Sequence, residues 1–185
     1  GQSYVLNFDG SNDYLSVAAS DNASTKLEAS SQFTVSAWVF IEGADRQQII
    51  YNDEFEVEWY GTGGNFFRFQ PGGVPSWGEV SKLHRYQWHH IVVTRNSSNS
   101  IQIYVNGDKS KYYVSNSDTF DDIMYIGRDP DEGQYFDGSM DELAIWSSEL
   151  SASQIDSLYN KGVPESATSI SGAASSLQSY WKLEQ

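Results

Sequence analysis

Residues 33–40, Phe-Thr-Val-Ser-Ala-Trp-Val-Phe, have the strand pattern from which the fold of this chain can be predicted. Phe33, Val35, Ala37 and Val39 alternate with the other four residues, which places the two sets of side chains on opposite sides of the backbone. This period of two predicts a β-strand. The β-branched and aromatic residues that fill it are those that pack well in a sheet.

Further short β-type runs lie on both sides of this strand along the chain, and turn residues separate them. These turns include residues 9–12, 61–65 and 106–108. Asn106-Gly107 predicts a hairpin, because this pair readily adopts the positive φ angles of a type I′ turn. About a dozen short strands with regular turns predict an all-β sandwich or barrel.

One segment near the C-terminal end has the pattern of a helix. Ser151 and Gln154 form a capping box, and Ile155, Leu158 and Tyr159 then share one face at helical spacing. We therefore expect one short helix in an otherwise all-β chain.

The sequence divides into three unequal parts. Residues 1–165 are expected to form the domain, and the Ser/Ala/Gly-rich residues 166–176 are typical of a linker. Residues 177–185 return to a strand pattern. This tail either folds back to complete the sandwich or begins a following module. We favour the first alternative, because an unfilled strand position would leave an exposed sheet edge.

Composition limits the possible functions. The chain has 185 residues, enough for one domain, with 11 Lys and Arg against 25 Asp and Glu and a net charge of −14. This balance argues against nucleic acid and anionic membrane surfaces as partners. There is no cysteine, and no apolar run is long enough to span a membrane. Any secretion signal is expected to lie outside this sequence. A neutral ligand, or one bound through a cation, fits best.

Six motifs in the same order resemble the laminin-G-like, concanavalin A-like jelly-roll domains. They are residues 6–15 (LNFDGSNDYL), 33–39 (FTVSAWV), 88–94 (WHHIVVT), 103–107 (IYVNG), 126–128 together with 136–146 (IGR and FDGSMDELAIW) and 150–159 (LSASQIDSLY). The resemblance implies a jelly-roll sandwich of two antiparallel sheets with one short C-terminal helix. It says less about the ligand, because the fold hosts many functions.

The resemblance also implies a structural Ca²⁺ ion between the Phe-Asp-Gly loop and the late Asp-Glu strand. In this sequence the ligands would be Asp9, the carbonyl of Gly10, and Asp141, and Glu184 would join them if the tail docks. Ca²⁺ requires several oxygen ligands of this kind. The alternative is that Asp9 makes an Asx-turn and Asp141 a hydrogen bond within its strand.

A second acidic segment follows the IGR motif. Asp129, Asp131 and Gly133 alternate as in a small calcium loop, but the segment lacks the full spacing of an EF-hand. It is therefore either a solvated acidic turn or the site of a ligand-bridging Ca²⁺ ion, which would let an acidic module bind sugar hydroxyls or carboxylates.

Strand alternation places Glu54, Glu56, Glu58 and Tyr60 on one face. Laminarinase-type hydrolases of this fold carry a similar pattern, in which the first Glu is the nucleophile and the last is the general acid. Here Glu56 occupies the place of an Asp, and the i and i+4 positions lie about 13 Å apart along a strand. This exceeds the separation of a retaining pair, about 5–5.5 Å. The face is otherwise a solvated surface or a lining for hydroxyl groups.

Loop and strand residues complete the candidate ligand-binding surface. Trp77 lies among turn residues and could stack on a pyranose ring, whereas Trp38, Trp88 and Trp146 lie in strands or motifs and fit the core better. The remaining candidates could form a concave hydrogen-bonding surface: Asp45, Arg46, Asn52, Glu56, Glu58, Tyr60 and Arg68.

From these patterns we expect a non-catalytic carbohydrate-binding or adhesion module, stabilised by Ca²⁺, in a secreted or cell-surface protein with several domains. Its partner would be a glycan or polysaccharide. Two alternatives stay open: a small glycoside hydrolase that uses Glu54 and Glu58, and a protein-binding or structural spacer in a tandem array.

Overall fold

The structure, a computed structural model, describes residues 5–17, 32–52, 55–62, 64–71, 78–80, 83–115 and 124–182. Trp77, Glu54 and Glu184, each a candidate from the sequence, lie outside these ranges. In the described part of the chain, no helix is both long enough and apolar enough to cross a membrane.

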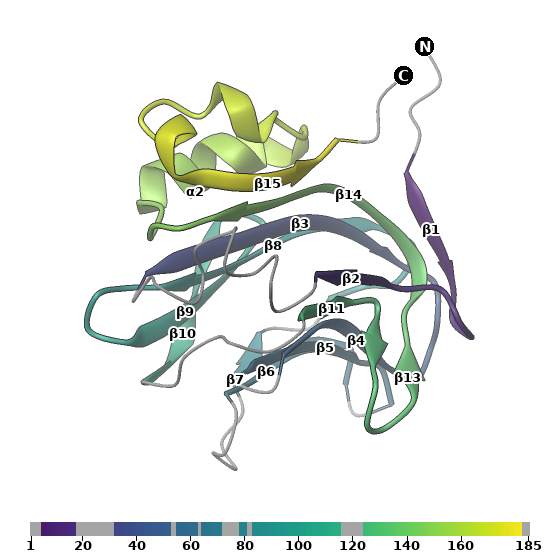
Figure 1. The fold of residues 1–185 in the computed structure, drawn as a ribbon. Coiled ribbons are helices and arrows are strands. Elements are labelled where there is room, and N and C mark those ends of the chain that lie inside the picture. The colour runs from purple at the N-terminus through teal and green to yellow at the C-terminus, as the bar shows by residue number, and fades with distance from the viewer. Residues whose placement is uncertain are drawn as a thin grey trace.

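Two antiparallel sheets stack face to face (Figure 1). The seven-stranded sheet has the order β1-β14-β3-β8-β9-β10, with β15 also paired to β14; its strands are β1 (Leu6–Asp9), β14 (Asp137–Trp146), β3 (Phe33–Ile41), β8 (Trp88–Arg95), β9 (Ser100–Val105), β10 (Asp108–Ser115) and β15 (Leu177–Trp181). The six-stranded sheet runs in the order β2 (Leu15–Val17), β11 (Met124–Ile126), β4 (Arg46–Asn52), β5 (Phe55–Tyr60), β6 (Phe66–Pro71) and β7 (Gly78–Val80). This architecture confirms the all-β jelly-roll prediction.

The main core lies between the two sheets. Alternate residues of β3, among them Phe33, Val35 and Val39, pack there against Val57 and Trp59 of β5. All five side chains are at most 1% exposed. The alternation that predicts the strand therefore also determines which side chains fill the sandwich.

β3 is buried on its second face as well, where Thr34, Ser36 and Trp38 are at most 3% exposed. Thr34 donates its hydroxyl to the carbonyl of Ser148 and accepts from the N–H of Leu150, which fixes the segment before the helix on the sheet. This part of the seven-stranded sheet is thus covered on both sides.

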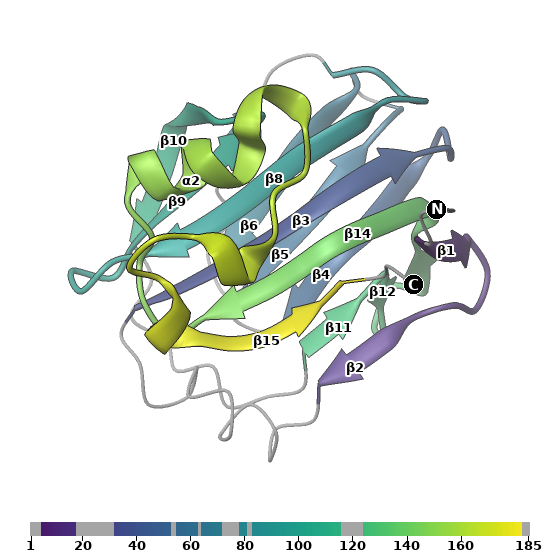
Figure 2. The ribbon, with the colours of Figure 1, turned by 90° about the horizontal axis from the view of Figure 1, so that it is seen from above.

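The cover is helical (Figure 2). It consists of α2 (Ala152–Tyr159) and three 3₁₀ turns, η1 (Asn160–Gly162), η2 (Ala167–Ser169) and η3 (Ala174–Ser176). The capping box predicted at Ser151 and Gln154 is present and begins α2. A second hydrophobic cluster forms beneath this cover and includes Trp146, Ile155 and Leu158.

Residues 166–176 differ from the linker that their composition predicts. Ala167, Ile170 and Ala173 are at most 4% exposed and belong to the second cluster. Their small side chains permit close packing against the sheet, which composition alone does not reveal. β15 then pairs antiparallel with residues 143–146 of β14, next to the part of the same edge where β1 pairs with residues 137–140.

Two local backbone features shape the strands. Asn106 and Gly107 have φ angles of 52° and 82° and connect Val105 to its partner Asp108, as predicted for the hairpin. In β14 the register shifts after Asp141, where Glu142 adopts the left-handed φ of 50°. This is a β-bulge in the middle of the longest strand, and bulges of this kind reorient side chains.

Candidate functional site

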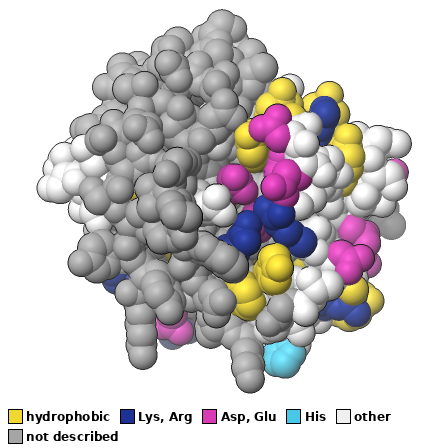
Figure 3. Space-filling model, turned by 90° about the horizontal axis from the view of Figure 1, so that it is seen from below, with side chains coloured by type: hydrophobic (Ala, Val, Ile, Leu, Met, Phe, Trp, Pro, Cys, Tyr) yellow, Lys and Arg dark blue, Asp and Glu magenta, His cyan; other side chains and the backbone are white. Residues whose placement is uncertain are grey.

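The outer face of the six-stranded sheet carries a cluster of charged and aromatic side chains. We call it the charged face and define it by Arg46, Tyr51, Glu56, Glu58, Tyr60 and Arg68 of the sheet with Asp129, Asp131 and Glu132 of the adjoining hairpin. Figure 3 shows basic side chains bordered by acidic ones on this side of the molecule. β5 presents its glutamates here because their neighbours Val57 and Trp59 point into the core.

Cross-strand pairing brings these side chains together. Glu58 lies opposite Arg68 of β6, while Tyr60 lies opposite Arg46 of β4. Directly opposed residues on one face have Cβ atoms about 4.5–5.5 Å apart, so their side chains interact. Sheet register therefore places both arginines around Glu58.

Glu58 is the centre of the ion-pair network. Its side chain has no exposed surface. Arg46 Nε donates to Glu58 Oε1 at 2.6 Å, and Arg68 Nε pairs with the other carboxylate oxygen. A buried carboxylate needs such partners, because its desolvation is otherwise very costly. This arrangement does not suit a general acid that must reach a substrate, which counts against the Glu54/Glu58 hydrolase.

Glu56 is the more accessible of the two carboxylates, with a side chain that is 21% exposed. Burial raises its pKa to about 7, and the negative charges of Glu58 and Asp129 add to this effect. Arg46 lowers the pKa only weakly, since its Nη2 lies 4.0 Å from Glu56 Oε2. Glu56 can therefore act as a hydrogen-bond donor or acceptor near neutral pH.

A short hairpin, β12 (Arg128–Asp129) and β13 (Gln134–Tyr135), forms one wall of the charged face. Tyr51 donates its hydroxyl to Asp131 Oδ2 at 2.7 Å, and Glu132 pairs with Arg46. Glu132 and Asp131 are exposed, so this wall offers carboxylate oxygens to solvent.

Aromatic rings border the charges. Tyr60 stacks on Phe66 with ring centroids 5.4 Å apart, and the guanidinium of Arg68 lies 5.4 Å from the centre of the Tyr60 ring. On the other side of the hairpin, the Arg128 guanidinium lies 4.8 Å from the ring centre of Tyr14, which is 43% exposed. The face thus combines planar charged groups with flat apolar surfaces.

The structure brings most of the sequence-predicted ligand residues together. Asp45 is exposed in the bend immediately before Arg46. Asn52 does not join them: it is 1% exposed and one residue out of phase with Tyr51, which is the residue opposite Glu56. The physical reason is a register shift in β4 between Gln48 and Ile50, which reverses the alternation beyond it.

The same shift explains a residue that sequence reasoning missed. Strict alternation from Arg46 reaches Asn52, whereas the bulge substitutes Tyr51 on the charged face. Glu132 was also missed, because its contact with Arg46 joins segments 86 residues apart. The acidic composition of its loop was the available signal.

The described members of the predicted calcium set do not converge. Asp9 lies opposite Asp137 of β14, four residues along the strand from Asp141. Asp9 Oδ1 accepts the N–H groups of Ser11 and Asn12, and these bonds lower its pKa. This is the Asx-turn alternative. The Gly10 N–H donates to the carbonyl of Phe136.

The rim carboxylates are likewise held by protein donors. Asp129 is 2% exposed, and its Oδ1 accepts the N–H groups of Asp131 and Glu132. Within the described ranges, no three His, Cys, Asp or Glu side chains are grouped so as to hold a metal ion. These residues do not fit a shared ion in this arrangement, and calcium stays a prediction from the resemblance.

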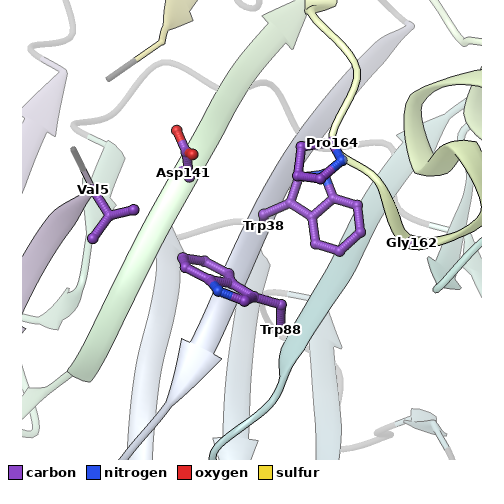
Figure 4. Close-up of a pocket in the computed structure, with 6 residues that line it drawn as sticks. All are labelled: Val5, Trp38, Trp88, Asp141, Gly162 and Pro164. Atoms are coloured by element: carbon purple, nitrogen blue, oxygen red, sulfur yellow. The ribbon is translucent and has the colours of Figure 1, made fainter. Parts of the chain in front are cut away.

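A pocket of about 270 Å³ opens on the opposite side of the sandwich, on the outer face of the seven-stranded sheet (Figure 4). We call it the tryptophan pocket. Its lining consists of Val5, Trp38, Trp88, Asp141, Gly162 and Pro164. Trp38 is buried, as its strand pattern suggests, but Trp88 is 40% exposed and does not lie in the core.

Comparison with known proteins agrees with this architecture. The family model Laminin_G_3, described as the concanavalin A-like lectin/glucanases superfamily, matches residues 9–156. The chain therefore belongs to this family, as its motifs predict. The comparison with curated proteins found no matching sequence.

Solved structures with the same fold include a native heptameric SAP-like pentraxin from Limulus polyphemus. It is 15% identical, with a TM-score of 0.67 over 97% of this chain and 91% of that one. A Bacteroides ovatus protein described as carbohydrate-binding is 20% identical, with a TM-score of 0.64 over 98% of this chain and 52% of that one. Domain 4 of the extracellular arabinanase AbnA from Geobacillus stearothermophilus, in complex with arabinotriose, is 23% identical (TM-score 0.55; 70% and 67% covered). At these identities the likeness shows the fold.

Proposed function

We propose that this chain is a non-catalytic carbohydrate-binding and adhesion module of a secreted or cell-surface protein, with the charged face as its binding surface. The observation that carries the proposal is the convergence of Arg46, Glu56 and Tyr60 on one accessible face. The family and the two carbohydrate-linked structural neighbours support the same class of function.

The chemistry of the charged face suits sugar hydroxyls. Guanidinium groups donate hydrogen bonds and carboxylates accept them, and such charge-assisted bonds are roughly twice as strong as neutral ones. Glu56, which ionises near neutral pH, can do either. Tyr60 adds a flat ring for the apolar face of a sugar.

Charge narrows the ligand class further. The defined charged face contains two arginines and five acidic residues. Glu58 already pairs with both arginines, so little positive charge remains for an anionic ligand. We therefore propose a neutral polysaccharide rather than a sulfated or uronic-acid polymer.

Retention of the purified domain on immobilised neutral and acidic polysaccharides tests the proposal. Neutral polymers should retain it, and the eluates should contain no newly released reducing sugar. Running the columns with calcium and again with EDTA separates an ion-dependent lectin from an ion-independent one.

Two substitutions locate the surface. Tyr60→Ala and Glu56→Gln should each weaken retention at least about fivefold, as expected for one lost stacking or charge-assisted contact. Trp88→Ala is the matched control, because it removes an exposed aromatic side chain from the opposite face. If Trp88→Ala abolishes retention and Tyr60→Ala does not, the charged face is not the site. No retention on any polymer would favour a protein-binding or spacer role.

A further inference from the structure

The tryptophan pocket has features that the carbohydrate proposal does not use. Its walls come from five separate parts of the chain: the segment before β1, strand β3, strand β8, the middle of β14, and the segment after α2. Convergence of this kind produces a concave site rather than a flat surface. Ligand pockets begin at roughly this size, about 300 Å³, so the occupant must be small.

Strand register explains why these side chains meet. Asp141 lies directly opposite Trp38, and Trp38 lies directly opposite His90. Trp88 is two residues from His90 on β8 and therefore faces the same side of the sheet. Figure 4 shows the Asp141 carboxylate and the indole rings of Trp38 and Trp88 around one space.

In the described part of the chain, the floor of the pocket consists of packed aromatic rings and an uncharged histidine. The Trp38 ring is packed against the rings of His90 and Tyr159, at centroid distances of 5.1 and 5.9 Å. The His90 ring is bonded to the Ser36 hydroxyl at 2.8 Å. Burial lowers the pKa of His90 to about 3, so this ring is neutral at physiological pH.

The backbone at Asp141 is built in an unusual way. The bulge begins here, and Glu142 holds a left-handed φ of 50° that a residue with a side chain seldom adopts. Two bonds hold this conformation: the Glu142 N–H donates to Asp141 Oδ1 at 2.7 Å, and Tyr180 of β15 donates its hydroxyl to Glu142 Oε2. Strained backbone of this type is concentrated at functional sites.

From this arrangement we propose that the tryptophan pocket binds a small soluble alkylammonium cation, with Asp141 as the counter-ion and Trp88 as the π-face. Among the described residues that line the pocket there is one carboxylate and no basic side chain, and the chain as a whole has a charge of −14. A cation over a tryptophan ring is attracted to its π-electrons. Val5 and Pro164 supply apolar surface for the alkyl groups.

A neutral sugar fits this pocket less well than an alkylammonium ion. A pyranose carries several hydroxyl groups, and each one buried against Val5 or Pro164 without a partner would lose its hydrogen bonds to water. An alkylammonium ion needs one opposite charge and apolar contacts, which is what the lining offers. The proposal is therefore independent of the glycan surface on the other sheet.

The test is a titration of the intact chain with choline, in which binding is measured by calorimetry and by tryptophan fluorescence. We expect a Kd on the order of 1 mM or tighter, as suits so small a ligand. The neutral isostere 3,3-dimethylbutan-1-ol, in which carbon replaces the charged nitrogen, should bind at least about tenfold more weakly, because it lacks the ion pair and the cation–π attraction.

Two variants assign the binding to this pocket. Asp141→Asn keeps an oxygen for the Glu142 N–H but removes the charge, and Trp88→Ala removes the exposed ring; each should weaken choline binding at least about tenfold. Tyr86→Ala, which removes a ring that is 60% exposed and outside the pocket lining, should leave it unchanged. Melting curves establish that each variant is folded.

Three results would overturn the proposal. They are the absence of choline binding to the folded chain, equal binding of choline and its neutral isostere, and full binding by Asp141→Asn. Glycan retention is measured in parallel on the same variants. Glycan retention is proposed to depend on Tyr60 and Glu56, whereas choline binding is proposed to depend on Asp141 and Trp88. A failure of one proposal can therefore be told apart from a failure of the other.

Discussion

The two outer faces of this sandwich differ in the kind of side chains that cover the sheet. The seven-stranded sheet is covered by α2 and the 3₁₀ turns, so its outer residues form a second hydrophobic core that includes Trp146. The six-stranded sheet carries the charged face, where Glu58 is buried by ion pairs instead. The outer side chains of one sheet are thus buried by apolar packing, and those of the other are held by ion pairs. The difference separates the covered part of the seven-stranded sheet, which stabilises the fold, from the charged face, which is available for a polar ligand.

The largest effect should come from the second core. Trp146→Ala removes a side chain with no exposed surface from beneath the helical cover. We expect a loss of about 3–5 kcal/mol in the free energy of unfolding, measured by urea denaturation. Tyr60→Ala on the charged face is the comparison and should cost about 1 kcal/mol, the usual size for a partly exposed residue. Equal costs for the two variants would contradict the division between the faces.

The buried ion pair should come next. Arg68→Met leaves one oxygen of Glu58 without its cation while Arg46 remains, and we expect a loss of about 2–3 kcal/mol. In the double variant Arg68→Met/Glu58→Leu no carboxylate stays buried, so part of this loss should be recovered. Urea denaturation of both variants measures these changes in the free energy of unfolding. A double variant that is less stable than the single one would show that Glu58 has another role.

A smaller effect concerns pH and Glu56. Its pKa of about 7 in the folded chain exceeds the ordinary 4.5, so between these values the folded state binds more protons than the unfolded state. The free energy of unfolding therefore falls as pH rises from 4.5 to 7. Because the side chain is partly exposed, we expect Glu56→Gln to stabilise the chain by about 1 kcal/mol at pH 8 and by less at pH 5. The same shift at both pH values would contradict the raised pKa.

Calcium removal should have the smallest effect. Asp9 and Asp129 already accept backbone N–H groups, and Asp9 lies away from Asp141 along β14. We expect EDTA to change the melting temperature by less than about 1 °C, whereas an ion at 100 times its Kd would contribute about 2.7 kcal/mol, or several degrees. A drop in melting temperature of that size would show that the chain does bind the Ca²⁺ ion that the family resemblance implies.

The alternation of residues within single strands was sufficient to predict much of the charged face. The period of two in residues 55–60 places Glu56, Glu58 and Tyr60 opposite Val57 and Trp59, and the core contains the latter pair. It failed where a strand is irregular. In β4 one register shift moves Tyr51 into the place where alternation predicts Asn52. Bulges depend on both strands of a pair, so a single strand's sequence carries little sign of them.

Contacts between residues far apart in the sequence were the second limit on what the sequence could predict. Trp88 has the strand context of a core residue, yet it is 40% exposed because the helical cover leaves this part of the sheet open. Ala167, Ile170 and Ala173 have the composition of a linker but are buried against that sheet. In both cases exposure depends on a segment distant in sequence.

Patterns within the sequence were enough to predict the all-β class, the family, the hairpin at Asn106-Gly107 and the capped helix. These follow from periodicity, turn chemistry and motif order, which act over a few residues. Three features emerge only from the folded chain: the pairing of carboxylates with arginines, the separation of Asp9 from Asp141, and the pocket lined by Trp38, Trp88 and Asp141. The physical reason is that sheet register, bulges and the position of the helical cover set these distances, and all three depend on contacts between residues far apart in the chain.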